Sequence, residues 1–212
     1  MATENRLDLI KPFGPWIAKI NIPDDILLKL NNYVDQIILD EEKSKKQDLG
    51  KKLAGNVKQE FELDENFRKE SGWENLLKKA SSKWIEVAIK KKISEFKILD
   101  TWIVRQFANE YNPIHFHSGH LSGAGFLKLP NDFGKTTQDG KINQNGSLTL
   151  VHGSKQFLSS SMYAITPKVG DFYLFPHYLM HMVYPFYGNN EERRSISFNA
   201  KIDENIFDVY KQ

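Results

Sequence analysis

Residues 112–130 read NPIHFHSGHLSGAGFLKLP, and within this stretch residues 114–117 alternate apolar side chains with histidines. On an extended strand, Ile114 and Phe116 face one side of a sheet, whereas His115 and His117 face the other. The Cα atoms of the two histidines are then roughly 6.5 Å apart, so both imidazoles can bind one metal ion. The stretch predicts a β-strand with a candidate metal site on one face, although His-x-His alone is equally compatible with ordinary strand histidines.

The chain around this stretch consists of short β-branched and aromatic runs separated by turn residues. The runs that we predict as strands are 98–107, 114–117, 123–129, 147–152, 169–176, 180–184 and 195–202. Turn signals such as Asn112-Pro113 and Asn145-Gly146 lie between them. Many short strands at near-regular spacing are typical of a sandwich or a barrel, so we predict a mainly β core for residues 97–202.

The first 96 residues have a different pattern, in which apolar residues recur at helical spacing. One predicted helix begins at Asp24 and runs to Ile38, and a second begins after Ser71-Gly72 and runs from Trp73 towards Phe96. Residues 40–60 show no sustained period and are predicted to form a loop or a frayed helix. Both helices have an apolar stripe, so we expect them to pack on the outer face of the larger sheet.

The composition describes an ordinary folded protein without a dominant charge. The chain has 212 residues, 40% of them apolar and 26% charged, with a net charge of +2. This suits one domain, with a helical part (1–96), a β core (97–202) and a C-terminal tail (203–212). So small a net charge gives a weak electrostatic field, which predicts neither nucleic-acid nor membrane binding.

The chain has no cysteine, which excludes thiolate metal sites and is consistent with a cytoplasmic location. The oligomeric state stays open.

All the histidines of the chain lie in the predicted β core, at positions 115, 117, 120, 152, 177 and 181. A catalytic metal needs three protein ligands and open positions, so His115 and His117 require a third ligand from a distant strand. We choose His181, which lies among apolar neighbours in YLMHMV, residues 178–183. The other three histidines are more typical of surface or structural residues.

A second polar strand face follows twelve residues after His181. In RRSISFN, residues 193–199, the alternation places Arg193 and Ser195 on one face and Ile196 with Phe198 on the other. An arginine and a hydroxyl turned into a barrel can bind a carboxylate through a charged fork and an added donor. The alternation favours Arg193 over Arg194 for this role, and a surface basic pair is the other interpretation.

The chain resembles the 2-oxoglutarate-Fe(II) oxygenases, a family common in marine bacteria and their phages. Three segments carry the resemblance in order: 112–130, then 167–181 (PKVGDFYLFPHYLMH), then 193–199. It covers about residues 97–202, and more weakly residues 11–15. The three motifs together are specific, whereas any one alone is weak.

The resemblance implies a double-stranded β-helix (jelly roll, cupin-like) of the prolyl-hydroxylase-like superfamily. It implies Fe(II) bound by His115 and His181, with 2-oxoglutarate held by Arg193 and Ser195. The implied activity is a dioxygenase that hydroxylates a C–H bond of an amino acid, peptide or small metabolite, releasing succinate and CO2. If the protein is encoded by a phage, the implied location is the host cytoplasm.

One position departs from the wider superfamily, because His117 stands where an aspartate or glutamate is usual. A neutral ligand leaves the site more positive by one charge, and it leaves open that an acidic residue or His120 completes the metal site. Two other readings also stay open. One is a cupin-like metalloenzyme without 2-oxoglutarate, which would not need Arg193, and the other is a non-catalytic β-barrel that binds a partner.

Overall fold

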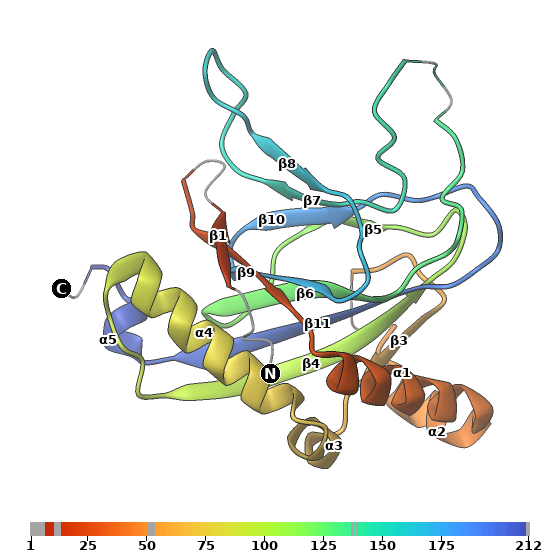
Figure 1. Ribbon diagram of the computed structural model, residues 1–212, viewed down its shortest axis with the longest axis horizontal. Helices are drawn as coiled ribbons and strands as arrows, with labels where there is room; N and C mark the ends of the chain where they lie inside the picture. The colour runs from red at the N-terminus through yellow and green to blue at the C-terminus, as the bar shows by residue number, and fades with distance from the viewer. Residues whose placement is uncertain (1–6, 11–13, 51–53, 137, 139, 211–212) are drawn as a thin grey trace.

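The computed structural model describes residues 7–10, 14–50, 54–136, 138 and 140–210, and its core is two antiparallel sheets that face each other (Figure 1). The larger sheet has the strand order β1-β2-β9-β6-β11-β4-β3, and the smaller sheet has the order β5-β10-β7-β8. Strands far apart in the sequence therefore lie side by side. The fold is mainly β and is the double-stranded β-helix predicted from the sequence.

The strand bounds agree with the predicted runs to within a few residues. The larger sheet contains β1 (Asp8–Ile10), β2 (Ile17–Asn21), β3 (Gln59–Glu62), β4 (Phe96–Gln106), β6 (Leu121–Lys128), β9 (Asp171–Pro176) and β11 (Arg193–Ile202). The smaller sheet contains β5 (Asn112–His115), β7 (Leu148–Val151), β8 (Met162–Ile165) and β10 (Met180–Val183). The prediction missed β8 and the three strands β1 to β3 in the first 96 residues, which are therefore not purely helical.

The helices lie on the side of the larger sheet that faces away from the smaller sheet (Figure 1). They are α1 (Asp24–Leu39), α2 (Glu41–Gln47), α3 (Glu65–Glu70), α4 (Trp73–Ile89) and α5 (Glu204–Phe207). The apolar stripes of α1 and α4 are buried, with Ile37 and Trp84 in one core cluster with Ile196 and Phe198 of β11. The prediction that both helices pack on the outer face is confirmed. The second helix ends earlier than predicted, at Ile89, where Lys90 adopts a left-handed conformation.

The two faces of the larger sheet differ because strand side chains alternate. On β6, Gly123 and Gly125 turn towards the helices, where an added Cβ at either position would collide with the ring of Phe172. These glycines let β6 approach the aromatic core closely. The next positions of the same strand, Ala124 and Phe126, line a cavity between the sheets. The helices thus pack on one face of this sheet and leave the other face for a site.

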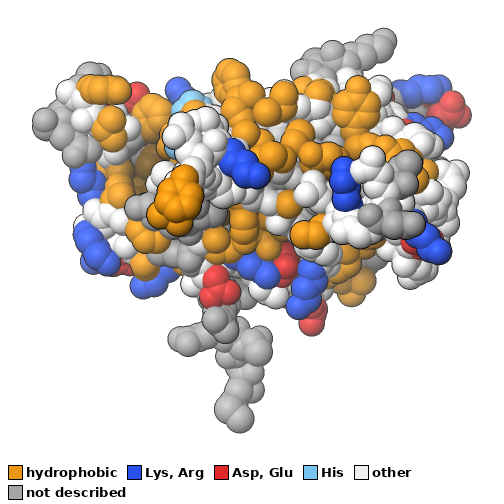
Figure 2. Space-filling model, turned by 90° about the horizontal axis from the view of Figure 1, so that it is seen from above, with side chains coloured by type: hydrophobic (Ala, Val, Ile, Leu, Met, Phe, Trp, Pro, Cys, Tyr) orange, Lys and Arg blue, Asp and Glu red, His pale blue; other side chains and the backbone are white. Residues whose placement is uncertain are grey.

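Figure 2 views the molecule from the side of the smaller sheet, where apolar side chains cover much of the middle of the face and most charged side chains lie near its rim. None of the helices in the described part of the chain has both the length and the hydropathy needed to span a bilayer.

Candidate functional site

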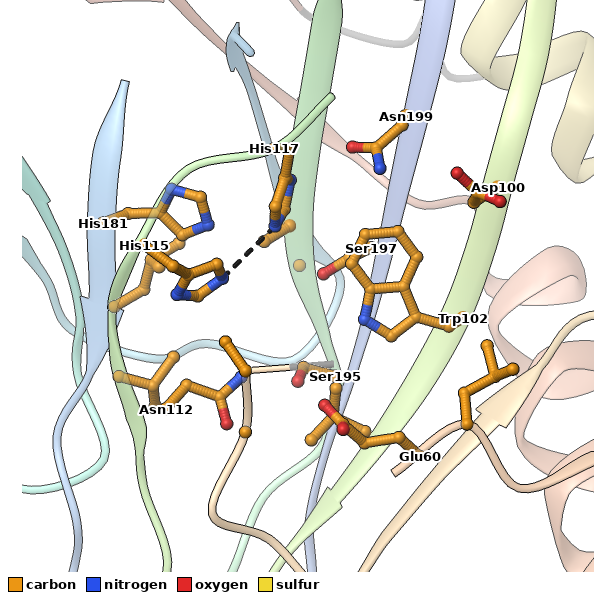
Figure 3. A pocket seen from close by; sticks show the side chains of 18 of the residues that line it. Glu60, Asp100, Trp102, Asn112, His115, His117, His181, Ser195, Ser197 and Asn199 are labelled. Carbon is orange, nitrogen blue, oxygen red and sulfur yellow. Dashed lines mark hydrogen bonds between the residues drawn. The ribbon is translucent and has the colours of Figure 1, made fainter. Parts of the chain in front are cut away.

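A cavity of about 470 Å³ lies between the two sheets and brings together side chains from both (Figure 3). The smaller sheet contributes His115 and His181, and the larger sheet contributes Arg193 with the alternating residues that follow it on β11. Its volume is typical of a small-molecule site. All the site residues predicted from the sequence line this one cavity, namely His115, His117, His181, Arg193 and Ser195.

Three histidines converge at one end of the cavity. His115 lies on β5 and pairs directly with His181 of the antiparallel neighbour β10, while His117 follows just after β5. The candidate ligand nitrogens of these three residues all lie within 4.8 Å of one another. We call them the three-histidine cluster. It contains no carboxylate, so the described part of the chain supplies no acidic residue to this group.

Each ring of the cluster is oriented by a hydrogen bond between its Nδ1 atom and an oxygen of the protein. The Nδ1 of His115 is 2.7 Å from the carbonyl oxygen of Pro113, and the Nδ1 of His181 is 2.8 Å from that of Leu179. A carbonyl only accepts, so both Nδ1 atoms carry the proton. The Nδ1 of His117 contacts the Ser122 hydroxyl, which itself lies within hydrogen-bond distance of two acceptors. Since that hydroxyl has one proton to donate, His117 also donates through Nδ1, and all three Nε2 lone pairs stay open.

The open Nε2 atoms are close enough to repel one another without a cation between them. The Nε2 atoms of His115 and His117 are 3.3 Å apart (Figure 3). Two nitrogens bound to one ion at about 2.0–2.1 Å in tetrahedral geometry would lie about 3.3 Å apart. The spacing therefore fits two ligands of a single metal ion.

The pKa values of the cluster favour the neutral, metal-binding form of each ring. Burial lowers the pKa of His117 to about 2, and repulsion by His181 and His115 adds to this. Burial and the neighbouring His115 lower the pKa of His181 to about 4. The pKa of His115 is also lowered, chiefly by burial. Neutral imidazole is the form that binds a transition metal.

Arg193 and Arg194 are both almost completely buried, each 1% exposed, but their surroundings are opposite. Arg194 binds Glu192 and, from α1, Asp35, with nitrogen–oxygen distances of 2.8 and 2.7 Å. Arg193 lines the cavity, and no carboxylate of the described chain pairs with it. Burial lowers the pKa of Arg193 to about 9, so at neutral pH it is a cation to which the described residues offer no counter-charge.

Two neutral oxygens hold the Arg193 guanidinium in place. Its Nε donates to the carbonyl of Gly146 at 3.0 Å, and its Nη1 donates to the Ser195 hydroxyl at 3.2 Å. The guanidinium carbon also lies 5.1 Å from the centre of the Phe126 ring. Gly146 adopts a positive φ of 68°, which glycine permits in the turn before β7. The Arg193 Nη2 atom takes no part in these two bonds.

The remaining histidines lie outside the cluster. Buried His120 accepts a hydrogen bond from the Ile202 N–H at 3.1 Å and stacks on Phe207, so it does not complete the metal site. The His177 ring lies 5.6 Å from that of Phe207, and its Nδ1 donates to the His117 carbonyl. His152 lies beside Gly14, away from the cavity.

Sequence reasoning missed two residues of the site, one behind His117 and one in the cavity wall. Ser122 orients His117 and belongs to the 112–130 stretch, but its role depends on a contact between β6 and the segment after β5. Glu60 of β3 lies in a region predicted as a loop, and no local pattern marks it. Residues 11–13, part of the weaker N-terminal resemblance, lie outside the described residues.

Comparison of the sequence with family models finds one match. The family described as "Putative 2OG-Fe(II) oxygenase" matches residues 100–199. This range contains the three-histidine cluster, Arg193 and Ser195. A search of curated protein sequences finds no significant match.

Solved structures with a similar fold include two prolyl hydroxylases and an α-ketoglutarate-dependent epimerase. A prolyl-4-hydroxylase from Pseudomonas putida is 13% identical with a TM-score of 0.58, covering 86% of this chain and 91% of that one. A prolyl hydroxylase from Trichoplax adhaerens, in complex with a hypoxia-inducible-factor peptide, is 14% identical with a TM-score of 0.52, covering 99% and 89%. The α-ketoglutarate-dependent epimerase SnoN from nogalamycin biosynthesis is 13% identical with a TM-score of 0.56, covering 87% and 76%. At such identities these structures establish the fold.

Proposed function

We propose that the chain is a 2-oxoglutarate-Fe(II) oxygenase, as the family match over residues 100–199 supports, that the three-histidine cluster binds its iron and that Arg193 binds its co-substrate. Fe(II) and 2-oxoglutarate are the cofactor and co-substrate of this family. The chemistry that they supply when bound is oxidation by O2, with 2-oxoglutarate converted to succinate and CO2.

The cluster fits Fe(II) by the kind and number of its donors. Three imidazole nitrogens suit a first-row transition metal, and three protein ligands leave positions open for small molecules. The Nδ1 contacts of the rings hold the nitrogens in place before metal binds. With His117 in place of the usual carboxylate, the loaded site is one charge more positive, which strengthens its attraction for an anionic co-substrate.

The observation that carries the proposal is the buried, unpaired charge of Arg193. A protein keeps such a charge at a cost, because burial removes its hydration and nothing in the described chain neutralises it. An incoming carboxylate supplies both the opposite charge and planar acceptors that match the guanidinium. The Ser195 hydroxyl adds a donor at the same place. We infer that the distal carboxylate of 2-oxoglutarate binds here, while its 2-oxo acid end points to the cluster.

We propose hydroxylation of a C–H bond as the reaction, with an amino acid, a peptide or a small metabolite as substrate. The two hydroxylases of similar fold support this choice, and SnoN shows that epimerisation also occurs on this fold. The chain's own part is to exclude water, to hold the co-substrate and to orient the substrate. We further propose that the whole chain acts as one domain.

The test is co-substrate binding by matched arginine variants. In the absence of O2, Fe(II) and 2-oxoglutarate should give the visible charge-transfer band of the iron chelate with the wild-type protein. Arg193→Ala should lose about two to three decades of affinity for 2-oxoglutarate, because breaking a buried charge pair costs about 3–5 kcal/mol. Iron binding should survive in this variant.

Arg194→Ala is the control, since this side chain faces away from the cavity. It should keep the charge-transfer band while losing stability. If Arg193→Ala keeps full affinity for 2-oxoglutarate, the co-substrate site lies elsewhere. Failure of 2-oxoglutarate to bind the wild-type protein would favour a cupin-like metalloenzyme that does not use it.

A further inference from the structure

Glu60 is a buried acidic side chain of the cavity wall that the proposed chemistry does not use. It lies on β3, the edge strand of the larger sheet, and is only 1% exposed. Its Oε2 atom is buried and has no hydrogen-bond partner in the described part of the chain. Figure 3 shows its carboxylate at the same cavity as the three-histidine cluster. A buried carboxylate without a partner is unfavourable unless a ligand supplies the missing hydrogen bond or the opposite charge.

The sheet register places Glu60 on the same face as Ser195. Glu60 pairs with Val104 of β4, and Val104 pairs with Ser195 of β11, so the three residues form one row across the sheet. Two strand spacings separate the ends of the row, roughly 10 Å at Cα. Glu60 and Ser195 therefore lie at different places on the cavity wall.

The nearest cation on the neighbouring strand is turned to the other face. Arg105 is adjacent to Val104 and binds Glu192 at 2.8 Å, so it does not reach the Glu60 carboxylate. Asp48 lies close enough to Glu60 to add negative charge. Burial raises the pKa of Glu60 to about 7, and the charge of Asp48 contributes to the shift.

The atoms around the Glu60 carboxylate form a small acceptor-rich recess. An added Cβ at Gly55 would lie 2.8 Å from Glu60 Oε1 and 2.9 Å from the side-chain oxygen of Asn112. The absence of a side chain at Gly55 keeps this recess open. Two further acids on the same face, Glu62 and Asp100, line the cavity and are exposed. They extend the negative potential from the recess towards solvent.

We propose that Glu60 binds a cationic group of the substrate, so that the enzyme oxidises a molecule carrying an ammonium or a guanidinium. The inference rests on the proposed function of the three-histidine cluster and Arg193. A cation supplies a counter-charge, which no described residue gives to Glu60, and donates a hydrogen bond to Oε2, which has no donor among those residues. A cation also favours the ionised carboxylate, whereas a neutral donor does not offset the cost of burying that charge. The anionic co-substrate and the cationic substrate group are thereby directed to opposite walls of one cavity.

The test uses the enzyme loaded with Fe(II) and 2-oxoglutarate without O2, and probes that differ by one charge. The pairs are Nα-acetyl-L-lysine with Nα-acetyl-L-norleucine, Nα-acetyl-L-arginine with Nα-acetyl-L-citrulline, and an N-terminally acetylated lysine tripeptide with its side-chain-acetylated form, each titrated by calorimetry. In at least one pair the cationic member should bind about tenfold or more tightly than its neutral partner. Glu60→Gln should remove that preference, because hydrogen bonds to a charged group are worth about one to two decades.

Glu65→Gln is the matched control, since it removes the same charge from an exposed side chain of α3. It should keep the preference. Equal binding of charged and neutral probes, no binding of any cationic probe, or a preference that survives in Glu60→Gln would each overturn the inference.

The charge-transfer band separates this failure from failure of the proposed function. If the band forms in wild type and Glu60→Gln but the cationic probes are not preferred, only the substrate inference fails. If the band is absent in the wild type, the proposed site itself is wrong. Glu60→Gln is nearly isosteric and removes a buried unpaired charge, so its melting temperature should not fall.

Discussion

Arg193 and Arg194 are adjacent in the chain and both buried, yet Arg193 lines the cavity and Arg194 binds helix α1 to the sheet. The reason is the strand period, which turns consecutive side chains to opposite faces. On the helix side Arg194 binds Glu192 and Asp35, whereas on the cavity side the described residues offer Arg193 neutral oxygens and the Phe126 ring but no carboxylate. The same residue type therefore has opposite effects on stability at the two positions.

Methionine substitutions should reveal this difference in the ligand-free protein. Arg193→Met removes a buried cation whose lowered pKa shows that folding disfavours its charge, so the free energy of unfolding should rise by about 1–4 kcal/mol. Arg194→Met breaks paired interactions and should lower it by about 3–5 kcal/mol. Urea denaturation at neutral pH measures both. A loss of stability in Arg193→Met as large as that in Arg194→Met would show that the Arg193 charge is compensated.

Ser122 acts on the metal through His117. Its hydroxyl accepts the Nδ1 proton of that ring, and removal of such a partner commonly weakens metal binding by about 10- to 100-fold. Ser122→Ala should therefore bind Fe(II) more weakly by this factor, as measured by competition with a chelator. His152→Ala, a change outside the cavity, should bind metal as wild type does. Unchanged affinity in Ser122→Ala would mean that His117 is oriented by other contacts.

Glu60 should make stability depend on pH. Its pKa is raised from 4.5 to about 7 in the folded protein, so between these values the folded state keeps a proton that the unfolded state has lost. Stability then falls as pH rises through this window. Relative to wild type, Glu60→Gln should gain about 1–3 kcal/mol between pH 5 and about pH 8. Denaturation of both proteins across this range checks it, and parallel curves would contradict the raised pKa.

At the scale of the element, β11 links the core to the site. Its Ile196, Phe198 and Ala200 belong to the core cluster beneath the helices, and the intervening positions line the cavity. The strand lies between β4 and β6 in the larger sheet, so pairing on both sides fixes its orientation. A substitution on one face of β11 should therefore leave the side chains on its other face in their positions.

Paired substitutions on β11 test that independence. Phe198→Ala should lower the free energy of unfolding by about 3–5 kcal/mol, because it opens a void among fully buried side chains. Folded Phe198→Ala should still bind metal with normal stoichiometry. Ser197→Ala, on the cavity face, should change stability by no more than about 0.5 kcal/mol. Loss of metal from folded Phe198→Ala would show that the faces are coupled.

At the scale of the whole molecule, the site joins the two sheets. His115 and His181 come from the smaller sheet, whereas Arg193 and Ser195 come from the larger one. Iron and 2-oxoglutarate bound together would therefore connect the sheets across the cavity. The helices stabilise the larger sheet from outside and contribute no residue to the three-histidine cluster.

Ligand binding should accordingly stabilise the fold as a whole. At free ligand about 100 times the dissociation constant, binding adds about 2.7 kcal/mol of stability per ligand. The melting temperature should rise with Fe(II), rise again with 2-oxoglutarate, and return to its starting value after chelation. In Arg193→Met only the first rise should remain. A second rise of equal size in that variant would contradict the assignment of Arg193.

Much of the site was readable from local pattern. The polar face of residues 193–199, the shared face of His115 and His117, and the apolar stripes of the two main helices all follow from fixed side-chain periods. These periods are set by backbone geometry, so they appear wherever the chain is extended or helical. The mainly β character of residues 97–202 follows for the same reason.

What pattern could not supply are the contacts between distant segments. Ser122 meets His117, and Glu60 lines the cavity, only because the packed sheets bring these residues there. β3 has four residues and lies in a stretch without a clear period, so its place at the sheet edge depends on pairing with β4. The partners of the two arginines likewise come from other elements. Alternation along a strand is a local property of covalent geometry, whereas the neighbours of a side chain are chosen by packing of the whole chain.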